Sequence, residues 1–391
     1  MRIKECSLML ESQLSSTLTE SEILVSDIEE LILVLKAIGN NIESVRLWNE
    51  LDSVPWSDLK EVFSILQSCN KLKSLTIRRD RFRCSQICAI SAVLPNTIET
   101  LDVSRCGNIC ENHLKILISD LPRLQILSIN IDSLESGNIL AEALERVQIR
   151  EFYLDPSSTD HQSDPGPLNH LGILVPISET VEKMIVPPKW LDNPDSLPHF
   201  PKLQFIDIAD IGDDPNFSEA TFQKLFTKMP NLIEILIDGI IGLTGECIVK
   251  CLKGNKLRRL NLSSLDNDQI QPATILDILL TFHESLEEIY LQPFNFIEFP
   301  SSMPVFPMLK RLIIEGPGDY SYINYIYVLN NNVIPDLTDF FLNGLKHMPN
   351  LREVKFFYLA FSKERVDKAI REYCPRVKTT SFESCIDWNN D

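Results

Sequence analysis

Residues 98–119, IETLDVSRCGNICENHLKILIS, contain one complete unit of a pattern that recurs along the chain. The first half has apolar residues at the spacing of a short strand, at Ile98, Leu101 and Val103. The second half, residues 111–119, changes to helical spacing, with Leu114, Leu117 and Ile118 on one face. The stretch therefore predicts a short strand, a tight turn and a helix.

The apolar triplet of this strand recurs through most of the chain. Its intervals are irregular, from 22 residues between Val181 and Leu203 to 42 residues between Leu309 and Leu351. The other triplets are Ile42/Val45/Leu47, Leu72/Leu75/Ile77, Leu124/Leu127/Ile129, Ile149/Phe152/Leu154, Val181/Met184/Val186, Leu203/Ile206/Ile208, Leu232/Ile235/Ile237, Leu257/Leu260/Leu262, Leu286/Ile289/Leu291, Leu309/Leu312/Ile314, Leu351/Val354/Phe356 and Val377/Thr380/Phe382. The pattern predicts an irregular array of strands with insertions.

Proline marks the junction before six of these strands. Proline cannot continue a helix and moves the residue before it out of the helical region, so it ends one element and directs the chain into the next. The six prolines each stand two residues before a triplet and are Pro122, Pro201, Pro230, Pro307, Pro349 and Pro375. Their positions support the strand register that the triplets define.

Together with Cys106, which follows its triplet in the slot usually held by Asn or Cys, these features resemble a leucine-rich repeat. Over roughly residues 40 to 385 the array resembles the repeat portion of F-box leucine-rich-repeat proteins, relatives of the ribonuclease-inhibitor architecture. The resemblance implies an α/β solenoid, or horseshoe, of about twelve or thirteen turns, with parallel strands on the concave face and helices on the convex face.

We expect an N-terminal helical cap at residues 1–40 and an irregular leucine-rich-repeat solenoid at residues 41–391. Ser26 and Glu29 have the spacing of a capping box, and the apolar stripe that follows ends at Gly39. Loop insertions are expected near residues 155–180 and 315–335, where Pro, Ser, Asp and Gly or tyrosines and an Asn run interrupt the pattern.

Composition limits the classes of partner. With 37 basic and 55 acidic residues the formal net charge is −18, which repels phosphate backbones and anionic lipids, so no nucleic-acid and no membrane partner is expected. A solubilising role explains the charge, and a basic protein partner is the alternative.

The N-terminal residues lack a signal-peptide core, and ten cysteines suit a reducing compartment, so we expect a cytoplasmic or nuclear protein. The sequence does not indicate an oligomeric state.

Chemistry-bearing residues do not form a recognisable constellation. Six histidines are scattered, and the chain has no P-loop or G-x-G-x-x-G stretch, so we expect no catalytic site, no metal and no cofactor. Three C-x3-C pairs stand among Ile and Leu, which favours core packing over a zinc site. The pairs are Cys84/Cys88, Cys106/Cys110 and Cys247/Cys251, and Cys106 and Cys385 occupy the Asn/Cys slot of the repeat.

The candidate site is the exposed face of the strands, where residues between the apolar slots turn outward. Aromatic residues there are typical anchors of protein interfaces, and acidic residues there suit a basic partner. The candidate protein-binding residues are Trp48, Arg78, Tyr153, Asp155, Asp207, Asp238, Tyr290, Glu315 and Phe357.

These residues predict a non-catalytic scaffold that recognises a protein on the concave face. The resemblance implies a more specific role as substrate receptor of a cullin-type ubiquitin ligase. The alternatives are a bacterial effector and a ligase-type enzyme with a cryptic catalytic cysteine, for which Cys84, Cys88, Cys247 and Cys251 are the candidates.

Overall fold

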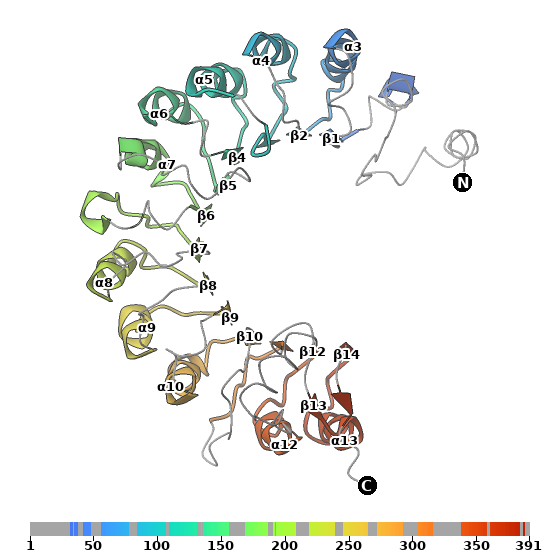
Figure 1. Ribbon diagram of the computed structural model, residues 1–391, viewed down its shortest axis with the longest axis vertical. Helices are drawn as coiled ribbons and strands as arrows, with labels where there is room; N and C mark the ends of the chain where they lie inside the picture. The colour runs from blue at the N-terminus through green and yellow to red at the C-terminus, as the bar shows by residue number, and fades with distance from the viewer. Residues whose placement is uncertain are drawn as a thin grey trace, which may run out of the picture. The chain divides into compact units, whose positions relative to one another are not determined.

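Short strands and helices alternate along the chain in the computed structural model (Figure 1). It describes residues 32–33, 35–37, 42–47, 56–77, 84–106, 109–130, 134, 136–155, 169–186, 191, 193–208, 219–238, 245–264, 272–291, 304–315, 338–357, 360–383 and 386–387. Packing divides the chain into two compact units, residues 1–186 with 196–202, and residues 187–195 with 203–391.

In the first unit each strand is followed by a helix that leads to the next strand. The elements are β1 (Ser44–Leu47), α3 (Trp56–Leu66), β2 (Ser74–Ile77), α4 (Cys84–Ser91), β3 (Thr100–Asp102), α5 (Glu111–Ser119), β4 (Ile126–Asn130), α6 (Asn138–Leu144), β5 (Glu151–Asp155), the 3-10 helix Asn169–Ile173, α7 (Leu174–Ile177) and β6 (Lys183–Ile185).

The second unit has a similar order, except that no helix is described between β10 and β11 and that one additional pair of short strands is present. Its elements are the 3-10 helix Pro194–Ser196, whose last residue belongs to the first unit, β7 (Phe205–Ile208), α8 (Glu219–Thr227), β8 (Glu234–Asp238), α9 (Gly245–Leu252), β9 (Arg259–Ser264), α10 (Pro272–Phe282), β10 (Glu288–Leu291), β11 (Arg311–Glu315), α12 (Thr338–Leu345), β12 (Glu353–Phe357), β13 (Ala360–Phe361), α13 (Lys363–Tyr373), β14 (Thr379–Glu383) and β15 (Ile386–Asp387).

Strands within each unit pair in parallel and follow chain order. The register aligns the same slot of successive repeats: Leu75 lies opposite Leu101 in the first unit, and Leu260 lies opposite Ile289 in the second. The middle slot of every apolar triplet predicted from the sequence falls on one of these strands, and the first slot stands just before the strand. The predicted fold class is therefore confirmed, because parallel strands line one side of each unit and helices line the other (Figure 1).

The core of each unit lies between the strands and the helices. The middle slots Leu101, Leu127 and Phe152 are completely buried, as are Ile206 and Ile235 in the second unit. Full burial of one such side chain stabilises the fold by about 1.5–3 kcal/mol. Repetition of these slots therefore supplies most of the favourable free energy of folding.

Polar groups connect each repeat to the preceding one. The Cys106 thiol is buried and donates to the Ile77 carbonyl at 3.0 Å, which explains why the sequence has cysteine in this slot. At the turns before the strands, the Thr97 hydroxyl donates to the Leu72 carbonyl at 2.6 Å, and Ser285 donates to Leu257 in the same way at 2.6 Å. Each bond gives a backbone carbonyl of one repeat an acceptor role toward a side chain of the next repeat.

Several sequence predictions concern residues outside the described part of the chain. Of the predicted cap at residues 1–40, the structure describes 32–33 and 35–37, which are helical, with Ile32 and Leu35 buried. Residues 156–168 and 316–337, which cover most of the predicted insertions, and Cys385 also lie outside it. The end of the first insertion contains the 3-10 helix Asn169–Ile173 and helix α7, whose Leu174 and Ile177 pack into the core.

A buried carboxylate joins two neighbouring helices of the first unit. Glu111, the first residue of α5, is fully buried and accepts backbone N–H bonds from Ser136 and Leu140, each at 3.0 Å. Leu140 is in the first turn of α6, where N–H groups have no partner within the helix. Glu111 therefore caps the helix of the next repeat.

Replacing Glu111 with alanine is expected to lower the free energy of unfolding by about 1–3 kcal/mol, because the N–H groups of Ser136 and Leu140 lose their acceptor and Leu140 is buried. Urea unfolding followed by circular dichroism measures this loss. Glu142→Ala is the control, because Glu142 forms an exposed ion pair with Lys115, and its loss should stay within about 0.5 kcal/mol. Equal losses in the two variants would contradict the capping role of Glu111.

Candidate functional site

The outward-facing residues of the strands are partly exposed, as the alternation of the strands predicts. In the first unit Tyr153 and Asp155 lie on β5, and in the second unit Asp207 lies on β7, Tyr290 on β10 and Phe357 on β12. Asp238 and Glu315 end strands β8 and β11, and their side chains are outside the described part. Trp48 and Arg78 also lie outside it.

Tyr153 belongs to a small polar cluster in the first unit. Its hydroxyl donates to the Glu151 carboxylate, which also lies 3.2 Å from the Lys183 amino group on the adjacent strand. Burial, and then the neighbouring Glu151, raise the pKa of Tyr153, so it is a neutral hydrogen-bond donor at physiological pH. Asp155 lies 3.7 Å from the Arg105 guanidinium, so this predicted contact for a basic partner already has a cation beside it.

Tyr290 has an apolar neighbour in the second unit. The strand register places it directly opposite Ile313 on β11 and Asn261 on β9, and all three residues are partly exposed. Asp207 lies three strands from Tyr290, about 14 Å away at the usual spacing of strands. Tyr290 and Ile313 are therefore neighbours on adjacent strands, whereas Asp207 is too far from Tyr290 to contact it.

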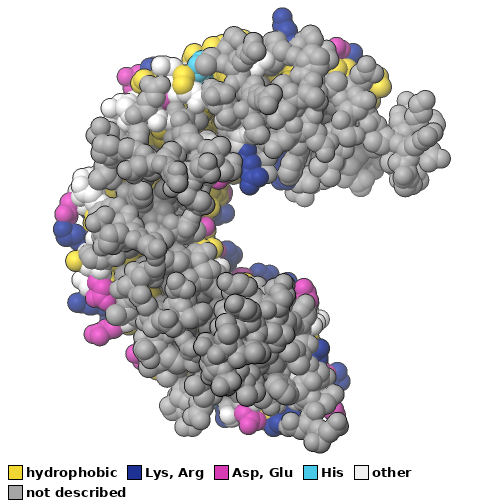
Figure 2. Space-filling view, in the orientation of Figure 1, with side chains coloured by type: hydrophobic (Ala, Val, Ile, Leu, Met, Phe, Trp, Pro, Cys, Tyr) yellow, Lys and Arg dark blue, Asp and Glu magenta, His cyan; other side chains and the backbone are white. Residues whose placement is uncertain are grey.

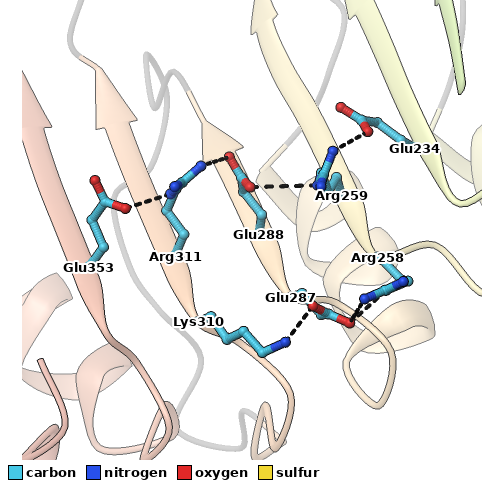
Figure 3. Close-up of polar contacts among 8 residues, drawn as sticks. All are labelled: Glu234, Arg258, Arg259, Glu287, Glu288, Lys310, Arg311 and Glu353. Atoms are coloured by element: carbon cyan, nitrogen blue, oxygen red, sulfur yellow. Dashed lines mark hydrogen bonds and ion pairs between the residues drawn. The ribbon is translucent and has the colours of Figure 1, made fainter. Parts of the chain in front are cut away.

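A ladder of alternating charges runs beside these residues (Figure 3). We define the charge ladder as the five side chains at one register position of strands β8 to β12: Glu234, Arg259, Glu288, Arg311 and Glu353. The Arg259 guanidinium lies 2.6 Å from Glu234 and 3.7 Å from Glu288. The Arg311 guanidinium lies 2.9 Å from Glu288 and 2.6 Å from Glu353. Each arginine thus bridges the strands on both sides of its own.

A second set of ion pairs lies one residue earlier in the chain. Glu287 accepts from Arg258 and Lys310, with the Lys310 nitrogen 2.6 Å away (Figure 3). The hydrogen bond from Lys310 is the largest cause of the lowered pKa of Glu287. A hydrogen bond from Lys355 lowers the pKa of Glu353 in the same way. Glu287 and Glu353 therefore remain ionised at neutral pH, and each has two cationic partners.

The charge ladder organises the surface more than it stabilises the fold. The Arg259 and Arg311 side chains are 58% and 44% exposed, and exposed ion pairs contribute about 0.2–1 kcal/mol each. A fully buried leucine of the core contributes more than that. The effect of the ladder is to hold five side chains in one conformation beside Tyr290 and Ile313. In the view of Figure 2, Lys and Arg side chains are visible next to the strands.

The sequence predictions above do not include the charge ladder. They considered the two outward positions after the middle apolar slot, whereas the ladder occupies the position immediately before it. The signal was present, because the residues before Ile235, Leu260, Ile289, Leu312 and Val354 alternate in sign. This alternation of charge can be recognised as a row of ion pairs only when the strands are known to be adjacent and in register.

The cysteines separate into different environments. Cys247 and Cys251 lie one turn apart on α9 with their sulfur atoms 3.7 Å apart, and burial raises the pKa of both, that of Cys251 to about 12. Burial also raises the pKa of Cys374 to about 11. The expectation of core packing is wrong for Cys88, which is exposed because the core-facing positions of α4 are Ile87 and Ile90. The Cys84 side chain lies outside the described part.

Cys110 has a histidine neighbour. Its sulfur lies 2.6 Å from Nδ1 of His113 at the start of α5, whereas Cys106 is in the preceding turn, so this C-x3-C pair is not stacked on one helix. Within the described residues, no group of three or more His, Cys, Asp or Glu side chains could hold a metal ion. No described helix is long and apolar enough to span a bilayer.

Comparison with known proteins gives distant structural likenesses. No protein-family model and no curated protein sequence matches the chain. A chain of the crystal structure of the Rad7 and Elc1 complex in yeast is 14% identical, with a TM-score of 0.44 and coverage of 91% of this chain and 93% of that one. A chain of the octameric complex of latrophilin 3, Unc5D and FLRT2 is 14% identical, with a TM-score of 0.31 and coverage of 88% and 84%.

A leucine-rich repeat protein from Bacteroides ovatus is 11% identical, with a TM-score of 0.18 and coverage of 89% of this chain and 72% of that one. These identities are far below the level that indicates a shared function. The fold assignment rests on the strand register and the buried apolar slots.

Lys355→Ala is expected to raise the pKa of Glu353 toward its ordinary value, because it removes the largest cause of the lowered pKa. A carbon-13 NMR titration of the glutamate carboxyls measures this pKa. Since Glu353 titrates lower in the folded state, its contribution to stability is present above its unfolded pKa, about 4.3, and is lost as pH falls through the folded value. Lys346→Ala is the control, and an unchanged pKa in Lys355→Ala would contradict the pairing.

Cys247 and Cys251 are expected to react with iodoacetamide at neutral pH far more slowly than exposed Cys88, because the thiolate is the reactive form. A pKa of about 12 leaves a thiolate fraction on the order of 10⁻⁵ at pH 7. Peptide mapping of the native protein by mass spectrometry gives the rates, and denatured protein should show all three cysteines alkylated. Rapid native alkylation of Cys251 would instead support a ligase-type enzyme.

Proposed function

We propose that the chain is a non-catalytic protein-recognition scaffold that binds its partner on the strand face of the second unit. The observation that supports this is the pairing of Tyr290 with Ile313 on adjacent strands, directly beside the charge ladder. The partner contacts this aromatic and aliphatic pair at the centre of the interface, and the charges surround it. Such an arrangement has the anatomy of a protein interface, with an apolar core and a polar rim.

Tyr290 suits the role of an anchor for two physical reasons. A tyrosine offers a large apolar ring and one hydroxyl, and tyrosines are over-represented among residues whose truncation weakens binding most. Its strand is hydrogen-bonded to β9 on one side and β11 on the other, so the backbone that carries it is already ordered. Binding therefore costs little conformational entropy at this position.

The charge ladder supports selectivity rather than affinity. Glu288 and Arg311 already neutralise one another and their neighbours, so a partner gains little by pairing with them and must match a fixed pattern of alternating charge. Wrong partners would place like charges together, which is costly. Binding energy is therefore expected from Tyr290 and Ile313, and discrimination from the ladder.

The remaining residues predicted from the sequence extend this proposal to a wider surface. Asp207, Asp238, Glu315 and Phe357 belong to the second unit and would lie at the periphery of the same interface. Tyr153 and Asp155 offer a separate contact in the first unit, and Trp48 and Arg78 lie near its N-terminal strands in sequence.

The resemblance to F-box leucine-rich-repeat proteins implies a more specific role, that of a substrate receptor of a cullin-type ubiquitin ligase. In that role the strand face would hold the substrate, and a ligase adaptor would bind elsewhere. The two proteins would therefore respond differently to a substitution on the strand face.

Tyr290→Ala is expected to weaken binding of the partner by about 30-fold or more, because truncation of an anchor residue typically costs at least 2 kcal/mol. Affinity capture from a eukaryotic cell extract with quantitative mass spectrometry identifies the partner, and titration of the purified partner gives Kd. Tyr290→Phe should retain most of the affinity, because the ring remains. Leu280→Ala removes an exposed apolar residue from helix α10 and is the matched control.

A captured set that does not change in Tyr290→Ala would contradict a binding role for this face. If a cullin adaptor is captured equally by the intact chain and by Tyr290→Ala while another protein is lost, the substrate-receptor role is supported. If no adaptor is captured, that specific role fails and general protein recognition remains.

A further inference from the structure

Three consecutive turns of the second unit contain basic residues and no acidic ones. They are residues 304–310 (PVFPMLK), 346–352 (KHMPNLR) and 374–378 (CPRVK), which lead into strands β11, β12 and β14. We define the basic edge as their five cationic side chains: Lys310, Lys346, Arg352, Arg376 and Lys378. In a chain with a net charge of −18, such a local excess departs strongly from the average.

Three of these cations, Lys310, Arg352 and Lys378, immediately precede strands β11, β12 and β14. Backbone hydrogen bonds place these three residues next to one another. The Arg352 N–H donates to the Lys310 carbonyl at 2.8 Å, and the Lys378 N–H donates to the Arg352 carbonyl at 2.8 Å. Successive residues of this row are therefore about 4.8 Å apart. Neighbouring residues of the charge ladder have the same spacing but opposite charges. In the basic edge the neighbouring charges have the same sign, which is unfavourable by itself.

Nearby carboxylates do not balance this excess. Glu287 pairs with Lys310 but also with Arg258, and Glu353 pairs with Arg311 and Lys355. Within the part of the chain that the structure describes, no carboxylate lies within 4.0 Å of the Lys346, Arg352 or Lys378 side chain. Among the described residues, the positive charge of the edge is therefore not neutralised.

Hydrogen bonds between the turns hold the basic edge in place. The Asn350 side chain donates to the Pro307 carbonyl at 2.7 Å, and Arg376 donates to the Asn350 side-chain oxygen. The Phe306 N–H donates to the His347 carbonyl at 2.8 Å. The three turns are therefore tied to one another, and the backbone positions that carry the cations have a fixed spacing before any partner arrives.

The first of these turns also exposes two aliphatic side chains. Val305 is 52% exposed and Met308 is 45% exposed, and both precede Lys310 in the same turn. Phe306 between them is completely buried and anchors the turn to the core. An apolar contact is thus available within the same segment as the positive charge.

We propose that the basic edge binds an acidic peptide segment of a partner protein that carries aliphatic residues among its carboxylates. Carboxylates would meet Lys310, Arg352 and Lys378, and an aliphatic side chain would cover Val305 and Met308. A peptide suits these observations better than a nucleic acid, because the aliphatic contacts have no counterpart on a phosphate backbone and the charge of the whole chain repels polyphosphates.

This surface is separate from the one centred on Tyr290. The edge consists of the turns before the strands, whereas Tyr290 and Ile313 lie on the outward face of the strands themselves. It would also serve a partner of opposite charge to the basic protein partner that is the alternative explanation of the overall charge. The two proposals therefore stand or fall independently.

The test measures binding of a fluorescein-labelled peptide of Glu, Asp and Leu by fluorescence anisotropy with the purified full chain. A length of about eight residues, roughly 26 Å when extended, is enough to cover the edge. Arg352→Glu/Lys378→Glu is expected to weaken binding by about tenfold or more. Arg123→Glu/Arg146→Glu makes the same change in net charge on exposed turns of the first unit, and should stay within about twofold of the wild type.

Further variants separate the components of the site. Val305→Ser/Met308→Ser should weaken binding several-fold without reducing its dependence on salt, and Tyr290→Ala should leave it unchanged. Circular dichroism confirms that each variant is folded, and Arg352→Gln/Lys378→Gln should give an intermediate loss. Absence of saturable binding, equal weakening in the first-unit control, or equally tight binding of a single-stranded DNA oligonucleotide would overturn the proposal.

Discussion

The structure depends on the in-register pairing of parallel strands. Because the strands of each unit follow chain order, the same position of successive repeats lies one strand spacing away from its counterpart. Inward positions then form continuous columns of Leu, Ile and Phe, such as Leu75, Leu101 and Leu127. Outward positions form columns as well, and whatever residue types the repeats place there become surface features several strands long.

The two kinds of column contribute differently to the free energy of folding. Buried slots stabilise by removing apolar area from water, and each repeat adds the same term again. The charge ladder is exposed and adds only a fraction of that, although it links five strands. Single buried polar groups such as Glu111 matter more individually, because their hydrogen bonds cannot be replaced by water once they are removed.

Charge in the second unit is sorted by position rather than mixed at random. At the ladder position of β8 to β12, glutamate and arginine alternate, whereas lysine and arginine are the formally charged residues on the three turns before β11, β12 and β14. Alternation neutralises the surface beside Tyr290, while the turns remain positive. A chain that is acidic overall therefore presents two surfaces with different electrostatic character in its second unit.

The sequence by itself determined the repeat architecture and most of the buried slots, although the last triplet, Val377/Thr380/Phe382, is not buried. Triplets such as Leu257/Leu260/Leu262 and the prolines before them are local signals, and the alternation of a strand then dictates which residues, Tyr153 and Tyr290 among them, face outward. Only the tertiary structure decided which outward residues meet. Glu288 reaches Arg259 and Arg311 across intervals of 29 and 23 residues, and the Arg352 N–H reaches the Lys310 carbonyl across 42. Strand pairing brings these residues together whatever the length of the insertion between them. The spacing in the chain varies from repeat to repeat, whereas the spacing in the sheet is constant.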